Sequence, residues 1–208
     1  MKKIRVIGAG PGARDYLLPV ALEEARRCDL LLGSKRALDL FEDFDGQKVD
    51  CGGRLSHYQT IIQEKGDRKA IGIVVTGDPG FYSLLAFLRR KLPDVSLEVI
   101  PGISSIQYLF SKLGQPWQNY RLLSFHGRHP DNLEEVLACE KGIALLTDRK
   151  MSPDRICNLL KGTPYQDYRA IVGENLSYPD ERIIISHVRE VAEMDDFQMS
   201  VLVIDNVS

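Results

Sequence analysis

Three short glycine-bearing segments in the first 105 residues have the composition of ligand-binding loops. They are Gly8-Ala9-Gly10-Pro11-Gly12, residues 76–82 (TGDPGFY) and residues 100–105 (IPGISS), and each follows a short apolar, β-branched run. Glycine has no Cβ, so a phosphate, ribose or adenine can approach its backbone closely. Open α/β sheets bind ligands where their strands end. Three such loops therefore predict one site for a nucleotide-like ligand.

The second and third loops add side chains that suit such a ligand. Asp78 can accept hydrogen bonds from a ribose or an amine, and Pro79 and Phe81 supply an apolar wall. Ser104 or Ser105 can face the ligand or cap the next helix, because serine is a favoured helix cap. An ordinary Asp-Pro-Gly turn and an ordinary serine cap remain the alternative interpretations of these two loops.

The first loop almost fits a dinucleotide-binding fingerprint, with Gly8, Gly10 and Ala13 at the required spacing. In the dinucleotide fold, however, the helix begins directly at the glycines, whereas Pro11, Gly12 and Pro19 delay it here by about six residues. The expected second strand, residues 30–32, is also followed by Gly33 and Ser34 and not by the acidic residue that binds a ribose. These features count against an oxidoreductase, and the lack of a G-K-[ST] motif excludes a P-loop.

The elements that position these loops alternate between short strands and helices, the pattern of α/β sheets with helical crossovers. Strands are expected at 4–7, 30–32, 48–51, 70–75 and 97–100, and then at 121–125, 143–147, 169–172, 182–186 and 200–204. Helices are expected at 19–27, 36–41, 57–65, 82–91, 105–113, 132–139 and 153–160. Turn-forming residues at 114–119 interrupt the pattern. We therefore expect two small α/β domains, residues 1–115 and 116–208, each with a mostly parallel or mixed sheet flanked by helices.

Composition narrows the classes of function. Lys and Arg total 27 against 29 Asp and Glu, so a net charge of -2 provides no general attraction for nucleic acid. The four cysteines are widely spaced, without a C-x-x-C pair, and are expected to be reduced, mostly buried thiols and not metal ligands. The apolar run at residues 4–7 is too short for a signal peptide, and no run is long enough to span a membrane. The sequence favours a soluble cytoplasmic protein.

In this order and spacing, the three loops resemble those of the tetrapyrrole (corrin and porphyrin) methylase family. The resemblance implies a homodimer of two-domain α/β chains that bind S-adenosylmethionine in the cleft between the domains and transfer its methyl group. The residues that would contact this cofactor come from the three loops and from strands of the second domain: Gly10, Pro11, Gly77, Asp78, Phe81, Ser104, Ser105, Leu146, Gly173 and Ser200.

Two segments of the second half resemble one branch of that family, which methylates carbon 5 of the corrin precursor cobalt-precorrin-7. They are residues 124–128 (SFHGR) and 173–182 (GENLSYPDER). The resemblance implies a stand-alone enzyme of cobalamin biosynthesis, paired functionally with a separate decarboxylating methyltransferase. Its substrate contacts would be Ser124, His126, Arg128, Asn175 and Tyr178. Open alternatives are an earlier corrin-pathway methylase, a diphthine-forming enzyme, a ribosomal RNA ribose methylase and a non-catalytic nucleotide-binding module. The net charge and the SFHGR segment count against the diphthine-forming enzyme and the RNA methylase.

The expected chemistry requires little from catalytic side chains, because the cofactor itself activates the methyl group that is transferred. If a proton must be removed from the substrate, His126 and Glu174 are the candidates. For Glu174 and Glu181 the alternative is a buried or interface ion pair, because a Glu beside Tyr178-Pro179 and Arg182 could equally fix a hairpin. A corrin precursor carries many carboxylates, which Arg128 and the pair Arg149-Lys150 could bind. For Arg149-Lys150 a solvated surface turn is the alternative.

Overall fold

The structure is a computed structural model that describes residues 3–52, 54–66, 69–125 and 133–206. The chain divides into two compact units, with the division between Ser104 and Ser105. The helix that follows Ser104 packs within the second unit, since the ring of its Phe110 lies 4.7 Å from that of Tyr120. The sequence placed this helix in the first domain, whereas the observed division falls before it.

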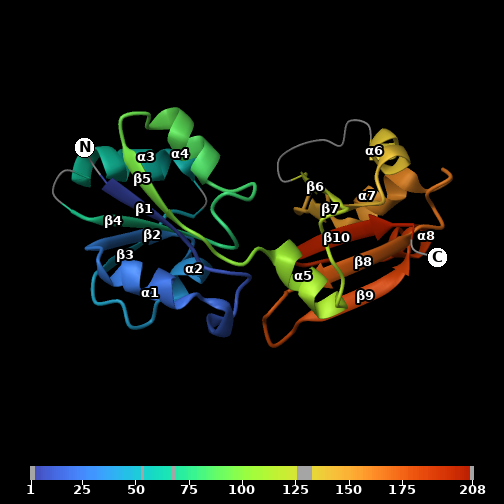
Figure 1. Cartoon of the computed structure of the whole chain (residues 1–208), viewed down its shortest axis with the longest axis horizontal. Helices are drawn as coiled ribbons and strands as arrows, with labels where there is room; N and C mark the ends of the chain where they lie inside the picture. The colour runs from blue at the N-terminus through green and yellow to red at the C-terminus, as the bar shows by residue number, and fades with distance from the viewer. Residues whose placement is uncertain (1–2, 53, 67–68, 126–132, 207–208) are drawn as a thin grey trace. The chain divides into compact units, whose positions relative to one another are not determined.

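The first unit contains a five-stranded parallel sheet in the order β3-β2-β4-β1-β5 (Figure 1). Its strands are β1 (Lys3–Gly8), β2 (Leu30–Gly33), β3 (Gln47–Asp50), β4 (Ile71–Val75) and β5 (Ser96–Ile100). Its helices are the short 3-10 turn η1 (Arg14–Tyr16), α1 (Pro19–Arg26), α2 (Lys35–Asp39), α3 (Leu55–Lys65) and α4 (Leu85–Lys91).

Apolar residues on both faces of the central strands place this sheet between two helical layers. Every residue of β2 and β4 is buried, as expected for strands covered on both sides. Along β1, Ile4 and Val6 pack with residues of α3 and α4, while Ile7 packs with residues of α1 and α2. Because alternate side chains of a strand point to opposite faces, β1 contributes to both cores.

The second unit contains a mixed sheet in the order β6-β7-β10-β8-β9 (Figure 1). Only the pair β6 and β7 is parallel, and the other neighbouring strands are antiparallel. The strands are β6 (Arg121–Ser124), β7 (Gly142–Leu146), β8 (Arg169–Glu174), β9 (Arg182–His187) and β10 (Ser200–Asp205). The helices are α5 (Ser105–Leu113), α6 (Leu133–Cys139), α7 (Pro153–Leu160) and α8 (Val188–Val191).

The core of this unit joins one face of the sheet to residues of α6, α7 and α8, among them Leu137, Ile156 and Val188. Helix α5 contacts β7 and buries Leu109, whose side chain lies close to Gly173 of β8. The helix carries its apolar residues on one side, with Ile106, Tyr108, Leu109 and Phe110 buried and Gln107 and Ser111 exposed. Such an amphipathic helix gains its stability by packing on the sheet.

The expected fold class is confirmed, with small parallel and mixed sheets flanked by helices. Most expected boundaries differ from the observed ones by up to two residues, and the largest error is at the helix expected from residue 82, which begins at Leu85. Tyr82 has φ 48°, a left-handed conformation that does not continue into a right-handed helix. Among the described residues no helix is long and apolar enough to cross a membrane. The cysteines are free thiols, buried except for Cys139, as expected.

Candidate functional site

Hydrogen bonds between backbones join the first two glycine loops at the carboxyl edge of the parallel sheet. The Ala9 N–H donates to the Val75 carbonyl at 2.8 Å, continuing the pairing of β1 with β4. Gly10 and Gly77 then form an isolated antiparallel bridge, in which the Gly77 N–H donates to the Gly10 carbonyl at 2.7 Å. The reciprocal bond from Gly10 to Gly77 is 3.3 Å long. The two loops are therefore held in one arrangement by main-chain atoms.

The third loop packs directly on the other two through Gly102. A Cβ on Gly102 would lie 2.3 Å from the Gly77 carbonyl oxygen and 2.9 Å from the Gly8 Cα. A Cβ on Gly8 would in turn lie 2.6 Å from the Gly102 nitrogen. Since all of these neighbours are backbone atoms that cannot rotate away, both positions require glycine. The three loops predicted to act together are thus in contact.

Gly77 has an open backbone surface, in contrast to Gly8 and Gly102. Its φ is 72°, which favours glycine, and a Cβ there would meet only the Ser104 Cα, at 3.7 Å. Ser104 is buried, and so is Pro11 of the first loop. Bare backbone beside a buried hydroxyl residue suits a flat ring or a ribose that must approach closely. The open backbone at Gly77 therefore suits a nucleotide-like ligand such as S-adenosylmethionine.

Asp78 connects the second loop with the third. One of its carboxylate oxygens accepts the Gly80 N–H at 2.7 Å, and the other accepts the Gly102 N–H at 3.1 Å. A carboxylate has further lone pairs, so Asp78 can still accept a hydrogen bond from a ligand. Its contacts here are with backbone amides, which adds a structural role to the expected binding role. Phe81, half-buried, lies with its ring 5.1 Å from that of Tyr82.

Four predicted residues of the second unit lie at one edge of its sheet. Ser124 ends β6 and is paired with Leu146 at the end of β7. Val201, which follows Ser200 in β10, is paired with both Leu146 and Gly173. The Thr147 hydroxyl also donates to the Ser200 carbonyl at 2.6 Å, a contact that no sequence motif indicates. The register of the sheet brings Ser124, Leu146, Gly173 and Ser200 to neighbouring positions.

Glu174 is buried at this edge and both of its carboxylate oxygens are occupied. One oxygen accepts bonds from Arg182, 2.7 Å from Nε and 2.6 Å from Nη2, and the other accepts the Gln198 N–H. This is the ion pair that the sequence offered as the alternative to a proton acceptor. Because its side chain is buried and its charge is paired with Arg182, Glu174 is poorly placed to reach a substrate.

The loop between β8 and β9 carries the predicted substrate residues Asn175 and Tyr178. Asn175 and Ser177 have left-handed backbones, with φ 46° and 71°. The Asn175 N–H donates to the Met199 carbonyl at 2.9 Å, and its side-chain amide donates to Asp180 at 2.8 Å. The loop therefore has a specific conformation in which part of the Asn175 amide is already used.

The other residues predicted to bind the substrate or its carboxylates give no support for a binding site. His126 and Arg128 lie outside the described residues. Arg149 and Lys150 are exposed, and Asp148 accepts the N–H groups of Lys150 and Met151 at 2.8 Å each, which makes this segment a tight turn. This geometry favours the surface-turn alternative for the pair.

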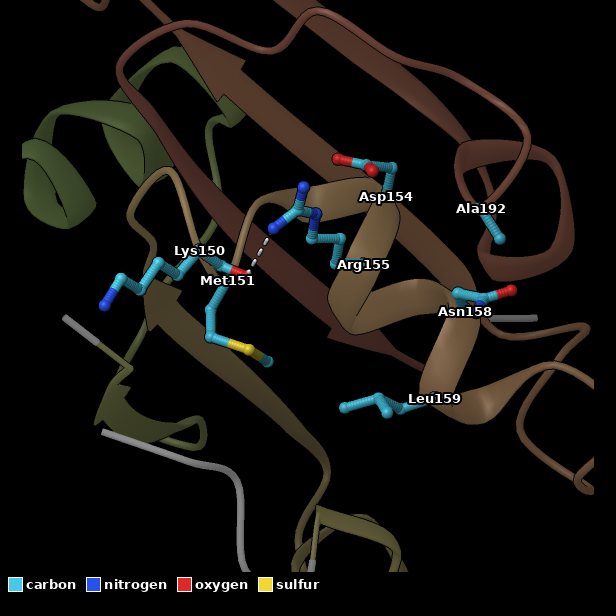
Figure 2. A pocket seen from close by; sticks show the side chains of 7 residues that line it. All are labelled: Lys150, Met151, Asp154, Arg155, Asn158, Leu159 and Ala192. Carbon is cyan, nitrogen blue, oxygen red and sulfur yellow. Dashed lines mark hydrogen bonds between the residues drawn. The ribbon is translucent and has the colours of Figure 1, made fainter. Parts of the chain in front are cut away.

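A surface hollow of about 700 Å³ lies beside α7 and this turn, lined by Lys150, Met151, Asp154, Arg155, Asn158, Leu159 and Ala192. Figure 2 shows that the Lys150 side chain points away from Arg155, whose guanidinium donates instead to the Lys150 carbonyl at 3.2 Å. The two cations do not converge on a common point. We therefore assign this hollow no part in binding carboxylates.

Comparison with known proteins shows the family. Residues 3–192 match the Tetrapyrrole (Corrin/Porphyrin) Methylases. The cobalt-precorrin-7 C(5)-methyltransferase of Salmonella typhimurium is 32% identical over 202 residues, covering 97% of this chain and 98% of that protein. The precorrin-6Y methylase of Archaeoglobus fulgidus has a similar fold, with a TM-score of 0.79, 22% identity and full coverage of both chains. A uroporphyrin-III C-methyltransferase of Thermus thermophilus, solved with S-adenosylhomocysteine, has a TM-score of 0.80 at 19% identity and covers 98% of this chain and 92% of that one.

The chain belongs to the tetrapyrrole methylase family, as its three loops predict. It is therefore a methyltransferase, and the expected class of enzyme is confirmed. S-adenosylhomocysteine, which the Thermus enzyme binds, is what remains of S-adenosylmethionine after its methyl group has been donated. The expected cofactor thus agrees with the family and with the open backbone at Gly77.

Proposed function

We propose that this enzyme transfers a methyl group from S-adenosylmethionine to carbon 5 of cobalt-precorrin-7 in cobalamin biosynthesis. The observation that carries the proposal is the near full-length similarity to a relative named for that reaction, at 32% identity over 97% of the chain. We further propose that it acts in the cytoplasm as a homodimer, and that a separate methyltransferase carries out the associated decarboxylation.

In the first unit, the cofactor is held by the three joined loops. Gly10 and Gly77 present backbone, Pro11 and Phe81 supply apolar surface, and Asp78 holds the second and third loops together while offering an acceptor to the ligand. Ser104, at the end of the third loop, and Ser105, the first residue of α5 and of the second unit, supply hydroxyl groups. In the second unit, Leu146, Gly173 and Ser200 contribute the edge of the mixed sheet.

The substrate is bound by Ser124, His126, Arg128, Asn175 and Tyr178 of the second unit. Arginine recognises carboxylates by paired hydrogen bonds, so Arg128 is the residue proposed to hold a carboxylate of the corrin. Both oxygens of Glu174 are already bonded, which leaves His126 as the proposed proton acceptor. Glu174 is then a structural residue at the base of the substrate-binding loop.

The cofactor supplies an activated methyl group on a positively charged sulfur, which leaves as a neutral thioether when a ring carbon attacks the methyl. The protein's task is to hold the carbon and the methyl in line and to exclude water. Alignment of this kind can contribute roughly 7–11 kcal/mol to lowering a barrier, so positioning is sufficient to explain much of the rate. For this reason the rigid, backbone-built first unit matters more than any single reactive side chain.

The experiment is to incubate the enzyme with labelled S-adenosylmethionine and a panel of cobalt-precorrin intermediates. We expect label on carbon 5 of cobalt-precorrin-7 and S-adenosylhomocysteine in equal amount. Label on an earlier intermediate alone would contradict the carbon-5 assignment and keep the class of enzyme. Binding of the cofactor without transfer to any tetrapyrrole would favour a non-catalytic nucleotide-binding module.

A further inference from the structure

We propose that Glu181 is a positioning residue, which fastens the loop between β8 and β9 to helix α5 so that this loop can hold the substrate. The inference rests on the proposed function, because it assigns Asn175 and Tyr178 of the loop to the substrate. It goes beyond that function by naming the residue that fixes their position.

Glu181 receives hydrogen bonds from two elements that are distant in the sequence. One carboxylate oxygen accepts the Ser177 N–H at 2.6 Å, within the loop itself. The other lies 3.1 Å from the Lys112 Nζ of α5. Tyr108, one helical turn before Lys112, also forms a side-chain hydrogen bond with Glu181. A single carboxylate therefore ties the loop both to itself and to the helix.

The surroundings of Glu181 make this contact stronger than an ordinary surface ion pair. Its side chain is 18% exposed, and Tyr108 is buried. Burial raises the pKa of Glu181, but hydrogen bonds from Tyr108, the Ser177 amide and Lys112 outweigh it, so the pKa lies below its ordinary value. The Lys112 Nζ also lies 5.5 Å from the centre of the Tyr108 ring, which favours the same arrangement.

The loop needs such a fastening because its backbone is unusual. Asn175 and Ser177 have positive φ angles, and left-handed conformations of residues other than glycine persist where surrounding contacts impose them. Glu181 accepts the N–H of Ser177, which is one of these two residues. Without Glu181, Ser177 loses this hydrogen bond, and any relaxation of its backbone toward an extended conformation would move the adjacent Tyr178.

Glu174 and Glu181 therefore have different tasks at the two ends of the same loop. Glu174 joins the start of β9 to the segment before β10, through Arg182 and Gln198. Of these two carboxylates, it is Glu181 that contacts both the loop backbone and α5. Loss of Glu181 should thus disturb the loop and leave the sheet in place.

The experiment compares Glu181→Ala and Glu181→Gln with Glu193→Ala as the matched control. Glu193 is an exposed carboxylate of the same unit that follows α8 and pairs with Lys161. We expect Glu181→Ala to raise the KM for the corrin at least tenfold and to lower kcat, while the Kd for S-adenosylmethionine changes less than threefold. Glu181→Gln, which keeps an oxygen for the Ser177 amide, should recover most of the loss.

Hydrogen exchange of the amides at 175–181 supplies a readout that needs no substrate. Glu181→Ala should speed exchange of these amides at least tenfold and leave those of β8 and β10 unchanged. Unchanged exchange, or kinetics equal to those of Glu193→Ala, would overturn the role of Glu181. The role of Glu181 would also be overturned if Glu181→Ala lost cofactor affinity, substrate affinity and thermal stability equally and Glu181→Gln recovered none of them. A wild-type enzyme that methylates no corrin would overturn the proposed function, and hydrogen exchange would still decide how the loop is held.

Discussion

The two units hold their predicted binding residues in place by different means. In the first unit, backbone packs on backbone, because a Cβ on Gly8 or Gly102 would lie less than 3.0 Å from backbone atoms of the neighbouring loops. In the second unit, carboxylates receive hydrogen bonds from separate segments, as Glu174 and Glu181 do. The first unit should therefore be sensitive to substitutions that add side-chain volume, and the second to substitutions that remove a charged group.

This difference matches what each unit is proposed to bind. A cofactor that is the same for a whole family suits a rigid surface of main-chain atoms that side-chain variation does not alter. A substrate that differs between family members suits a loop held by side chains, because a few substitutions change its conformation. Four predictions test whether added side-chain volume affects cofactor binding and whether lost charge affects substrate binding.

The largest expected effect on stability is at Asp205, at the end of the second sheet away from the site residues. Its carboxylate is fully buried and accepts bonds from the Tyr120 hydroxyl at 2.6 Å and from Arg169 at 2.9 and 2.8 Å. Asp205→Ala leaves Arg169 without its partner and should cost about 3–5 kcal/mol of unfolding free energy, measured by urea denaturation. At a temperature where the variant is folded, cofactor affinity should be unchanged. A loss of cofactor affinity would show that a carboxylate of this unit affects cofactor binding even when it lies at the other end of the sheet.

Gly102→Ala should have the next largest effect, and it should fall on the cofactor. The new Cβ would lie 2.3 Å from the Gly77 carbonyl, so the third loop must move, at a cost of typically 1–3 kcal/mol for such overpacking. We expect the Kd for S-adenosylmethionine, measured by calorimetry, to rise by about a hundredfold, equivalent to nearly 3 kcal/mol. Gly162→Ala is the control, because a Cβ there meets no atom within 4 Å, so that alanine acts only through the backbone strain of its φ of 79°. An equal rise in the Kd for the cofactor in Gly102→Ala and Gly162→Ala would contradict the proposal that added volume at Gly102 disturbs the cofactor loops.

Glu174→Ala should have a smaller effect on stability and act on the substrate. Arg182, its partner, is 54% exposed and can turn to water, so the expected cost is about 1–3 kcal/mol, as for one buried group left unpaired. We expect a raised KM for the corrin with little change in cofactor Kd. If Glu174 were instead the proton acceptor, kcat would fall by orders of magnitude while the KM stayed the same.

The smallest expected effect is a pH dependence from Glu181. Because its folded pKa is lowered, its contribution to stability is present above the unfolded pKa and is lost as the pH falls through the folded value. The wild type should therefore be more stable than Glu181→Gln near pH 7, by less than about 1 kcal/mol given the partial exposure of Lys112. Thermal denaturation should show the two proteins converging in acid. A gap that stays constant with pH would mean that the charge of Glu181 contributes nothing.

Much of the fold could be predicted from the sequence because its strands are short β-branched runs between turn residues. The start of α4 was missed because the conformation of Tyr82 is set by the loop before it and not by its own preference. Helix α8 was missed because its four residues have no periodicity, and it is defined by a capping box between His187 and Glu190. Such short-range hydrogen bonds form only after β9 has placed these residues.

The sequence by itself determined the family, because the three glycine loops require a residue without a side chain at fixed positions after strands. It also placed Asp78, Glu174 and Glu181 near the ligand-binding segments. Only the tertiary structure decided what these carboxylates do: Asp78 joins two loops, Glu174 pairs with Arg182, and Glu181 joins a loop to α5. The physical reason is that a glycine acts through its own backbone, which the sequence specifies locally. A carboxylate acts through its partners, and folding brings these from distant parts of the chain.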